Sequence, residues 1–198
     1  MSASLAAEDV PHGVCVLRAH VARDEAVDAF THGVVGAVRW LALGPLRSIA
    51  DVYVPFRLYE VITPSRPAAR PLVLGVDAVA GALDLYRFDN IPRSADLVNL
   101  HTRNHVNAVL SSSAARDVLL ARVQRLLYQR VGFLAAGRCH VDVQPVGDVI
   151  HVPYWVGFFG RRDTASLVVM DAVRRQIEGV KVRRLIAEWL RAGQEGRK

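Results

Sequence analysis

The sequence predicts an α+β fold: two tandem repeats, each a helix packed on an antiparallel sheet of three to four strands, followed by a C-terminal amphipathic helix. Two strand-like segments, Val152–Phe159 and Leu167–Val173, repeat the pattern of Val54–Tyr59 and Val73–Val79. In both places Val-Pro-aromatic is followed by an apolar run that contains Asp-Ala-Val. Because a duplicated segment folds the same way twice, the pattern predicts two similar units.

A helical pattern upstream of these strands also occurs twice. Five apolar positions with the 3-4-4-3 spacing of one helix face recur 93 residues later: Val27, Phe30, Val34, Val38 and Leu41 match Leu120, Val123, Leu127, Val131 and Leu134. The offset is 98 residues between Pro55 and Pro153, and 94 between Asp77 and Asp171. Length therefore varies between the elements and not inside them, as expected for a true repeat.

The first unit spans residues 13–88. Pro55 has no N–H to donate to a sheet, which favours an edge strand or a bulge over a central position. Gly44-Pro45 ends the helix before that strand. The expected elements are a strand over 13–20, a helix over 22–43, and strands over 51–62, 72–79 and 82–88.

Residues 89–104 contain many turn-forming residues and are interpreted as a linker. The second unit spans residues 105–180. Its helix begins at the cap-forming Ser111-Ser112-Ser113. That helix ends near Gly137, and strands follow over 138–145, 149–159, 167–173 and 177–180. Residues 181–192 carry one apolar face, which predicts the C-terminal amphipathic helix, and 193–198 form a frayed tail.

The segment Leu74–Leu83, with the sequence LGVDAVAGAL, resembles the end of PepSY-like modules, and one helix followed by antiparallel strands resembles PepSY-like and cystatin-like folds. The second copy departs from this pattern, because Arg174-Arg175 stand where the turn glycine is expected. The resemblance implies an α+β module that binds or inhibits other proteins.

Composition excludes several classes of protein. The chain of 198 residues is 52% apolar with a net charge of +6, so it can bury a core and is not disordered. Two cysteines are too few for a disulfide framework. The N-terminal residues lack the pattern of a signal peptide, and no apolar run is long enough to span a membrane. We expect a cytoplasmic protein.

Candidate metal ligands are few, and we expect no metal and no cofactor. His101 and His105 are four residues apart but have no third ligand nearby. Cys139 and His140 are adjacent on an expected strand and point to opposite faces, so they do not readily share an ion with His151. The sequence contains no phosphate-binding loop, zinc-protease motif or nucleophile elbow.

Asp77 and Asp171 are the two acidic residues that recur inside apolar strands. A pair of equivalent carboxylates could perform acid–base chemistry. The alternative, which we favour, is that each aspartate ends a strand and accepts hydrogen bonds from the turn that follows. We therefore expect Asp77 and Asp171 to be structural turn residues and expect no catalytic residues.

The leading hypothesis is a non-enzymatic protein-interaction or structural subunit that associates with itself or with a larger complex. The strand 154–159 is apolar on both faces, so its second face needs a helix of the same chain or a second subunit. The C-terminal helix is expected to dock on protein, with weak contact to a membrane surface as the alternative. The candidate interface residues are Tyr154, Trp155, Phe158, Phe159, Leu185, Trp189 and Leu190.

Two further hypotheses come from other classes. A small-ligand module or minor enzyme would have an apolar pocket between helix and sheet, lined by Tyr53, Tyr59, Tyr154, Trp155 and the two aspartates. Nucleic-acid binding would use the pairs Arg161-Arg162, Arg174-Arg175 and Arg183-Arg184, and it ranks last because acidic residues interrupt the basic ones.

Overall fold

The computed structural model describes residues 12–62, 72–131, 141–160 and 165–195. The predicted α+β class is confirmed: these residues form four α-helices, one 3-10 helix and a mixed sheet of eight strands. In chain order the elements are β1 (His12–Leu17), α1 (Arg23–Thr31), α2 (Gly33–Leu43), β2 (Leu46–Ile62), β3 (Leu72–Asp77), β4 (Tyr86–Phe88), η1 (Ser94–Asp96), β5 (Leu97–Thr102), α3 (Ser112–Val131), β6 (Asp142–Phe159), β7 (Ser166–Asp171), β8 (Gln176–Ile177) and α5 (Val180–Glu195).

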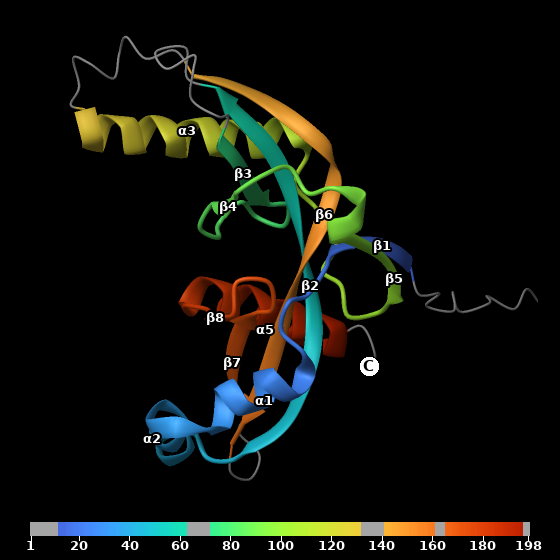
Figure 1. The fold of residues 1–198 in the computed structure, drawn as a ribbon, viewed down its shortest axis with the longest axis vertical. Coiled ribbons are helices and arrows are strands. Elements are labelled where there is room, and N and C mark those ends of the chain that lie inside the picture. The colour runs from blue at the N-terminus through green and yellow to red at the C-terminus, as the bar shows by residue number, and fades with distance from the viewer. Residues whose placement is uncertain (1–11, 63–71, 132–140, 161–164, 196–198) are drawn as a thin grey trace, which may run out of the picture.

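Two long antiparallel strands, β2 and β6, form the spine of the molecule (Figure 1). Val54 faces Val152 near the middle of this pair. Beyond the middle, the second half of β2 pairs with β3, and the second half of β6 pairs with β7. β4 extends the sheet from β3, and β8 extends it from β7. The spine therefore carries a small sheet at each end, within one continuous sheet.

Near the middle of the spine, two equivalent sets of backbone hydrogen bonds join each long strand to the residues that follow its short neighbour, β3 or β7. Ala78 donates its N–H to the carbonyl of Pro55, and Ala172 donates its N–H to the carbonyl of Pro153. The carbonyl of Ala78 accepts two N–H groups from the segment before α3, and the carbonyl of Ala172 accepts two from the segment before α1. The donors are Val109 and Leu110 in the first case and His20 and Val21 in the second.

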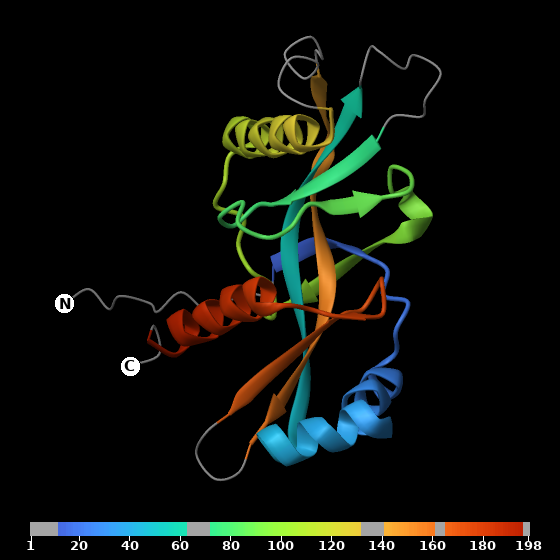
Figure 2. The same cartoon turned by 90° about the vertical axis from the view of Figure 1, so that its left-hand side faces the viewer.

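Two helices, α1 and α3, pack on the end of the sheet whose short strand lies far from them in sequence. In α1, Phe30 meets Phe159 edge to face with ring centres 6.1 Å apart. A side chain at Gly157 would collide with Phe30, so this glycine allows the helix to approach β6. In α3, Leu119 is buried in a cluster with Tyr59 and residues of β3. Figure 2 shows α3 at one end of the spine, α1 and α2 at the other, and α5 between them.

The sequence predicted two helix-on-sheet units and left open whether they form one sheet or two separate domains. The strands form one sheet, and each helix that precedes a long strand covers the end of the sheet built around the other long strand. The expected linker 89–104 is also part of the fold, because it holds η1 and β5. β5 pairs antiparallel with β1, and β1 joins β6 through a parallel bridge between Val16 and His151.

The predicted helix over 22–43 is two helices, α1 and α2. His32 is extended, and Gly33 has φ +73°, a value that favours glycine. A side chain at Gly36 would overlap the carbonyl of Thr31, so the chain turns sharply there. The 3.6-residue spacing of apolar positions continues across this break, so the spacing alone predicted one continuous helix.

Of the two expectations for Pro55, the edge strand is wrong, because β2 is central, between β3 and β6, whereas an irregularity in the β2–β6 register does lie beside Pro55, between Phe56 and Leu58. Tyr53 donates its N–H to Asn104 outside the named strands, and Pro55, two residues on, faces the same side. Pairing with β3 begins only at Phe56. Pro55 therefore lies between the contact of Tyr53 with Asn104 and the first residue that pairs with β3. At this position no strand that the structure describes offers an acceptor to an N–H group, so the sheet loses no hydrogen bond.

Other boundaries also moved. The two strands expected over 138–145 and 149–159 are one strand in the described residues, β6, because Gly147 (φ +64°) lies in a bulge opposite β2 instead of breaking the strand. The expected strand over 82–88 shortens to β4, the strand over 177–180 is replaced by β8, and the helix over 181–192 extends to Val180–Glu195. The expected end of the second helix near Gly137 lies outside the described residues.

Candidate interaction surface

The most unusual surface of the molecule is α2, which is apolar around most of its circumference and is exposed. Of its eleven residues only Gly36 is buried. Five large side chains on this helix are between 54% and 82% exposed: Val34, Val35, Val38, Trp40 and Leu41. A helix that is apolar all round is normally enclosed by protein or lipid. We name these five residues the α2 patch.

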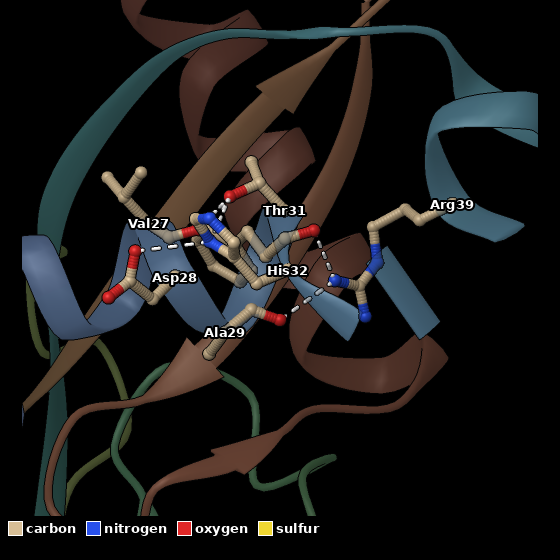
Figure 3. Close-up of polar contacts among 7 residues, drawn as sticks. Val27, Asp28, Ala29, Thr31, His32 and Arg39 are labelled. Carbon is tan, nitrogen blue, oxygen red and sulfur yellow. Dashed lines mark hydrogen bonds and ion pairs between the residues drawn. The ribbon is translucent and has the colours of Figure 1, made fainter. Parts of the chain in front are cut away.

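The corner between α1 and α2 holds the patch in place (Figure 3). Arg39 reaches back from α2 and donates through Nη1 to the carbonyl oxygens of Phe30, at 2.8 Å, and Ala29, at 3.2 Å. Its guanidinium also lies 5.9 Å from the centre of the Phe30 ring. Desolvation lowers the pKa of Arg39. The one charged side chain of α2 is therefore directed to the end of α1 and caps it.

The first helix ends in a local polar network that Figure 3 also shows. Thr31 donates its hydroxyl to the carbonyl of Val27 at 2.8 Å, and His32 lies 3.2 Å from the carboxylate of Asp28. These contacts are exposed and fix the direction in which the chain leaves α1.

A hollow of about 280 Å³ lies beside the α2 patch. Its walls come from α1, α2 and the adjoining ends of β2 and β6. The residues that line it include Phe30, Gly33, Gly36, Trp40, Leu46 and Phe159. A protruding apolar patch next to an apolar hollow is typical of surfaces that bind another protein.

The seven predicted interface residues are packed in the chain's own core. Tyr154 and Phe159 are buried, and the other five are partly buried. The two faces of the 154–159 strand are covered by different parts of the same chain: Trp155 donates its indole N–H to Val21 near α1, while Leu185, Trp189 and Leu190 of α5 pack against the cluster that contains Tyr154 and Phe158. The second subunit left open by the sequence is not needed for this cover.

Asp77 and Asp171 each lie at the end of a strand and accept hydrogen bonds from a turn. Asp77 accepts three backbone N–H groups, from Ala80 and Gly81 through Oδ1 and from Leu83 through Oδ2. Asp171 accepts two, from Val173 and Arg174, both through Oδ1. The two carboxylates bind different turns and do not share a site.

The predicted ligand-pocket residues are only partly brought together. Tyr53, Tyr154 and Trp155 line a cavity of about 220 Å³, whose walls are otherwise largely aliphatic. Tyr53 donates its hydroxyl to Asp51 at 2.6 Å, and desolvation followed by this bond raises its pKa. Tyr59 lies elsewhere and donates its hydroxyl to the carbonyl of Ser112. These two hydroxyls are therefore already engaged within the chain.

The histidines do not form a metal site in the described part of the chain. His105 and His151 meet edge to face with ring centres 6.0 Å apart. Among the residues that the structure describes, no group of three or more His, Cys, Asp or Glu side chains is placed to hold a metal. Cys139 and His140 lie outside those residues.

The arginine pairs do not form a continuous basic surface. Arg174 stacks on Tyr86, Arg175 pairs with Glu25, and Arg184 pairs with Glu188. Arg161-Arg162 lies outside the described residues. Phosphate binding favours cations gathered on one face, and these side chains are instead engaged separately.

Sequence reasoning missed the α2 patch, although a signal was present. The segment 33–43 contains only one charged residue. A helix without a polar face is normally enclosed on all sides, so this composition was the signal that α2 needs a covering partner. No helix in the described residues is long and apolar enough to cross a membrane. Comparison with protein-family models, with characterised proteins and with solved structures finds no match for this chain.

Proposed function

We propose that this chain is a non-enzymatic interaction subunit whose α2 inserts into an apolar groove of a protein partner. The observation that carries the proposal is the α2 patch: five large apolar side chains, more than half exposed, on a helix with one charged residue. Burying a valine or leucine side chain is worth about 1.5–3 kcal/mol. Enclosure of α2 by a partner is therefore strongly favourable, and a groove encloses a helix on more than one side.

A protein groove fits α2 better than a membrane surface. Helices that lie on membranes have a polar face rich in Lys and Arg opposite the apolar face. Arg39, the charged residue of α2, is turned back to Phe30 and Ala29 and does not supply such a face. The hollow beside Trp40 adds a socket for a side chain of the partner.

The scaffold that presents α2 is proposed to be a tandem duplication. Support comes from sequence and contacts together: the apolar patterns recur at offsets of 93 to 98 residues, and the hydrogen bonds of Ala78 and Ala172 are equivalent. The bridge between Val16 and His151 likewise has a counterpart between His105 and Tyr53. Each half in this arrangement lends its helix to the other.

The test compares two exposed valines in the full-length protein. Val38 lies in the patch and is 62% exposed, while Val109 lies outside it and is 77% exposed. A photo-crosslinking residue at position 38 should form protein adducts in the native cell, and one at position 109 should not. Val38→Lys should weaken the captured association at least tenfold, because one buried valine is worth more than about 1.4 kcal/mol, the equivalent of a factor of ten.

Light scattering and liposome sedimentation complete the test. If the partner is a second copy, the wild-type mass exceeds that of one chain at micromolar concentration, and Val38→Lys returns it to one chain while Val109→Lys does not. Equal behaviour of the two variants in every assay contradicts the proposal. Loss of liposome binding alone in Val38→Lys would show that lipid, and not protein, covers α2.

A further inference from the structure

The strand β5 lies at a margin of the sheet and, among the residues that the structure describes, pairs with a strand on one side only. In that part of the chain β4 and β8 also lie at such margins, but they have three and two residues, whereas β5 has six. In Figure 1, β1 and β5 lie to the right of the spine. An edge strand presents backbone N–H and C=O groups to which another strand can be added.

The register between β1 and β5 shows which residues of β5 are bonded to β1. Arg18 donates its N–H to the carbonyl of Asp96 at 2.7 Å, so these two residues form a hydrogen-bonded pair. In an antiparallel ladder, such pairs alternate with pairs that do not bond each other. Counting in steps of two from Asp96, the next residues of β5 that bond to β1 are Val98 and Leu100.

Leu97 and Asn99 occupy the intervening positions, so their N–H and C=O groups are directed away from β1. Natural edge strands are usually protected from further pairing by a proline, a bulge or a charged side chain within the strand. The sequence of β5, LVNLHT, contains no proline and no Lys, Arg, Asp or Glu, and its register with β1 is regular over all six residues. β5 therefore lacks the features that prevent the addition of a strand.

A cavity of about 220 Å³ lies against one face of this edge. Val98 and Leu100 of β5 line it, together with Val16, Tyr53 and Trp155 from three other strands. Successive side chains of a strand point to opposite faces of the sheet. Every second side chain of a strand added to β5 would therefore lie on the face of Val98 and Leu100. An apolar side chain suits this position, because the wall of the cavity is largely apolar.

Arginines around β5 give the edge a positive charge. Arg18 and Arg93 are exposed near the start of the strand, and Arg103 is exposed directly after its end. Two acidic residues lie nearby, and both are engaged: Asp96 accepts the N–H of Arg93, and Asp51, in the cavity wall, accepts two side-chain donors of the same chain. The charge around the edge is complementary to an acidic segment.

The same charges disfavour a second copy of this chain at the edge. Two β5 strands paired antiparallel would bring Arg18 and Arg93 of each copy close to Arg103 of the other. Like charges across an interface are unfavourable, and the whole chain carries a net charge of +6. The partner that fits is therefore a different protein with an acidic, extended segment.

We propose that β5 binds an extended acidic segment of another protein as an added strand, which exchanges backbone hydrogen bonds with Leu97 and Asn99 and places an apolar side chain in the adjoining cavity. Strand addition of this kind takes its affinity from the main chain and its specificity from pockets for alternate side chains. The interface goes beyond the proposed interaction through α2 and does not depend on it.

The test titrates the peptide acetyl-DEVTFTVED-amide into the full-length protein and measures backbone hydrogen exchange by NMR. The peptide has acidic ends and places its three apolar side chains on one face. At saturation, exchange at Leu97 and Asn99 should slow at least tenfold, because their N–H groups gain acceptors. Exchange at Val98 and Leu100 should slow less, because these groups are already bonded to β1. Equal slowing at all four residues would contradict strand addition.

Substitutions at Asn99 separate the backbone from the side chain. Asn99→Pro removes an N–H that points away from β1, so the fold is kept, and peptide binding should weaken at least fivefold. Asn99→Thr keeps the N–H and should leave binding unchanged. Unchanged affinity in Asn99→Pro would overturn the proposal.

A second pair of substitutions tests the charge of the edge. Arg103→Glu should weaken binding of the acidic peptide about fivefold at low salt, because it reverses a charge beside the added strand. Arg125→Glu makes the same change at an exposed position of α3 and should have a much smaller effect. The charge-reversed peptide acetyl-KRVTFTVRK-amide should bind at least tenfold more weakly than the acidic one.

The indole N–H signal of Trp155 reports on the cavity. The phenylalanine peptide should shift this signal, and acetyl-DEVTATVED-amide, which lacks the large apolar side chain, should shift it less and bind at least fivefold more weakly. Equal affinity of these two peptides would show that no side chain enters the cavity.

Three further outcomes overturn the proposal or separate it from the role of α2. Failure of the acidic peptide to bind at about 1 mM overturns it, as does equal binding of the basic peptide. A particle of two chains in the wild type that becomes one chain in Asn99→Pro would show that a second copy occupies β5. Val38→Lys should leave peptide binding unchanged, so the two proposals can fail independently.

Discussion

His151 is a buried histidine at the middle of β6, 7% exposed. Desolvation lowers its pKa, and the nearby His105 acts in the same direction, while backbone contacts with Cys15 and Val106 oppose the shift. Because β6 is part of the spine, the protonation state of this ring affects the stability of the whole fold.

A lowered pKa in the folded state means that the unfolded chain takes up the proton first as pH falls. We therefore expect the free energy of unfolding to be highest above about pH 6.5 and to fall between pH 7 and pH 5, by no more than about 1.4 kcal/mol per pH unit for one proton. Urea unfolding at several pH values measures this slope.

His151→Gln should reduce the slope between pH 7 and pH 5, and His20→Gln, which alters an exposed histidine, should leave it unchanged. An equal slope in wild type and His151→Gln would assign the pH dependence to other groups.

The sequence predicted that both aspartates end a strand and bind the following turn, but it did not predict how many hydrogen bonds each carboxylate oxygen accepts. The recurrence of Asp-Ala-Val located two strand ends, and both aspartates accept hydrogen bonds from turns there. Nothing in the sequence distinguished Oδ2 of Asp171 from Oδ2 of Asp77, because the difference depends on Leu83 and on Tyr86 from a distant strand. Such differences arise only when the chain is folded.

Among the elements, α5 has the apolar face that spacing predicted, and the structure selects one of the two surfaces that the sequence left open for it, the sheet of its own chain. Val182 and Ile186 are buried, and Leu185, Trp189 and Leu190 pack against the same cluster as Tyr154. For α2 the same kind of pattern was misleading, because Val34, Val38 and Leu41 fit a buried helix face but are exposed. Periodicity identifies which apolar residues share one face of a helix, but it does not identify the surface that covers this face.

Ile186 provides a test of α5 as part of the core. Ile186→Ala should lower the free energy of unfolding by about 2–4 kcal/mol, because it removes fully buried methyl groups and leaves a cavity. Arg184→Gln, which removes an exposed pair with Glu188 on the same helix, should have no measurable effect. Thermal and urea unfolding measure both.

Deleting residues 181–198 should lower the melting temperature, because it removes α5 from the core. It should not change the number of chains in the particle, which light scattering measures. Retention of the wild-type melting temperature by both Ile186→Ala and the deletion would mean that α5 does not stabilise this core.

At the scale of the whole molecule, the exchange of helices makes the two halves depend on each other. Phe30 of α1 packs against Phe159, Val168 and Met170, and Leu119 of α3 packs with Tyr59 and Val76. The sequence predicted similar elements in each half. It did not predict that each helix packs on the strands of the other half, because a helix buries the same apolar residues whichever half it covers. The choice between them depends on the geometry of the connections.

Fragments 1–104 and 105–198 test this dependence. Each fragment alone should lack cooperative unfolding, because its helix has no sheet to cover and its long strand has no long partner. An equimolar mixture should regain the circular dichroism and melting transition of the intact chain. A cooperative melting transition in either fragment alone would show that the halves are independent.

The position of α1 also has a consequence for synthesis. Residues 23–31 leave the ribosome early, but the apolar surface that covers Phe30 is made by β6 and β7, near the end of the chain. Through most of translation the first helix therefore exposes an apolar side without its partner, and the contacts that complete the fold are of high sequence separation and slow to form. We expect nascent chains of this protein to be clients of chaperones that recognise exposed apolar segments, until the last strands emerge.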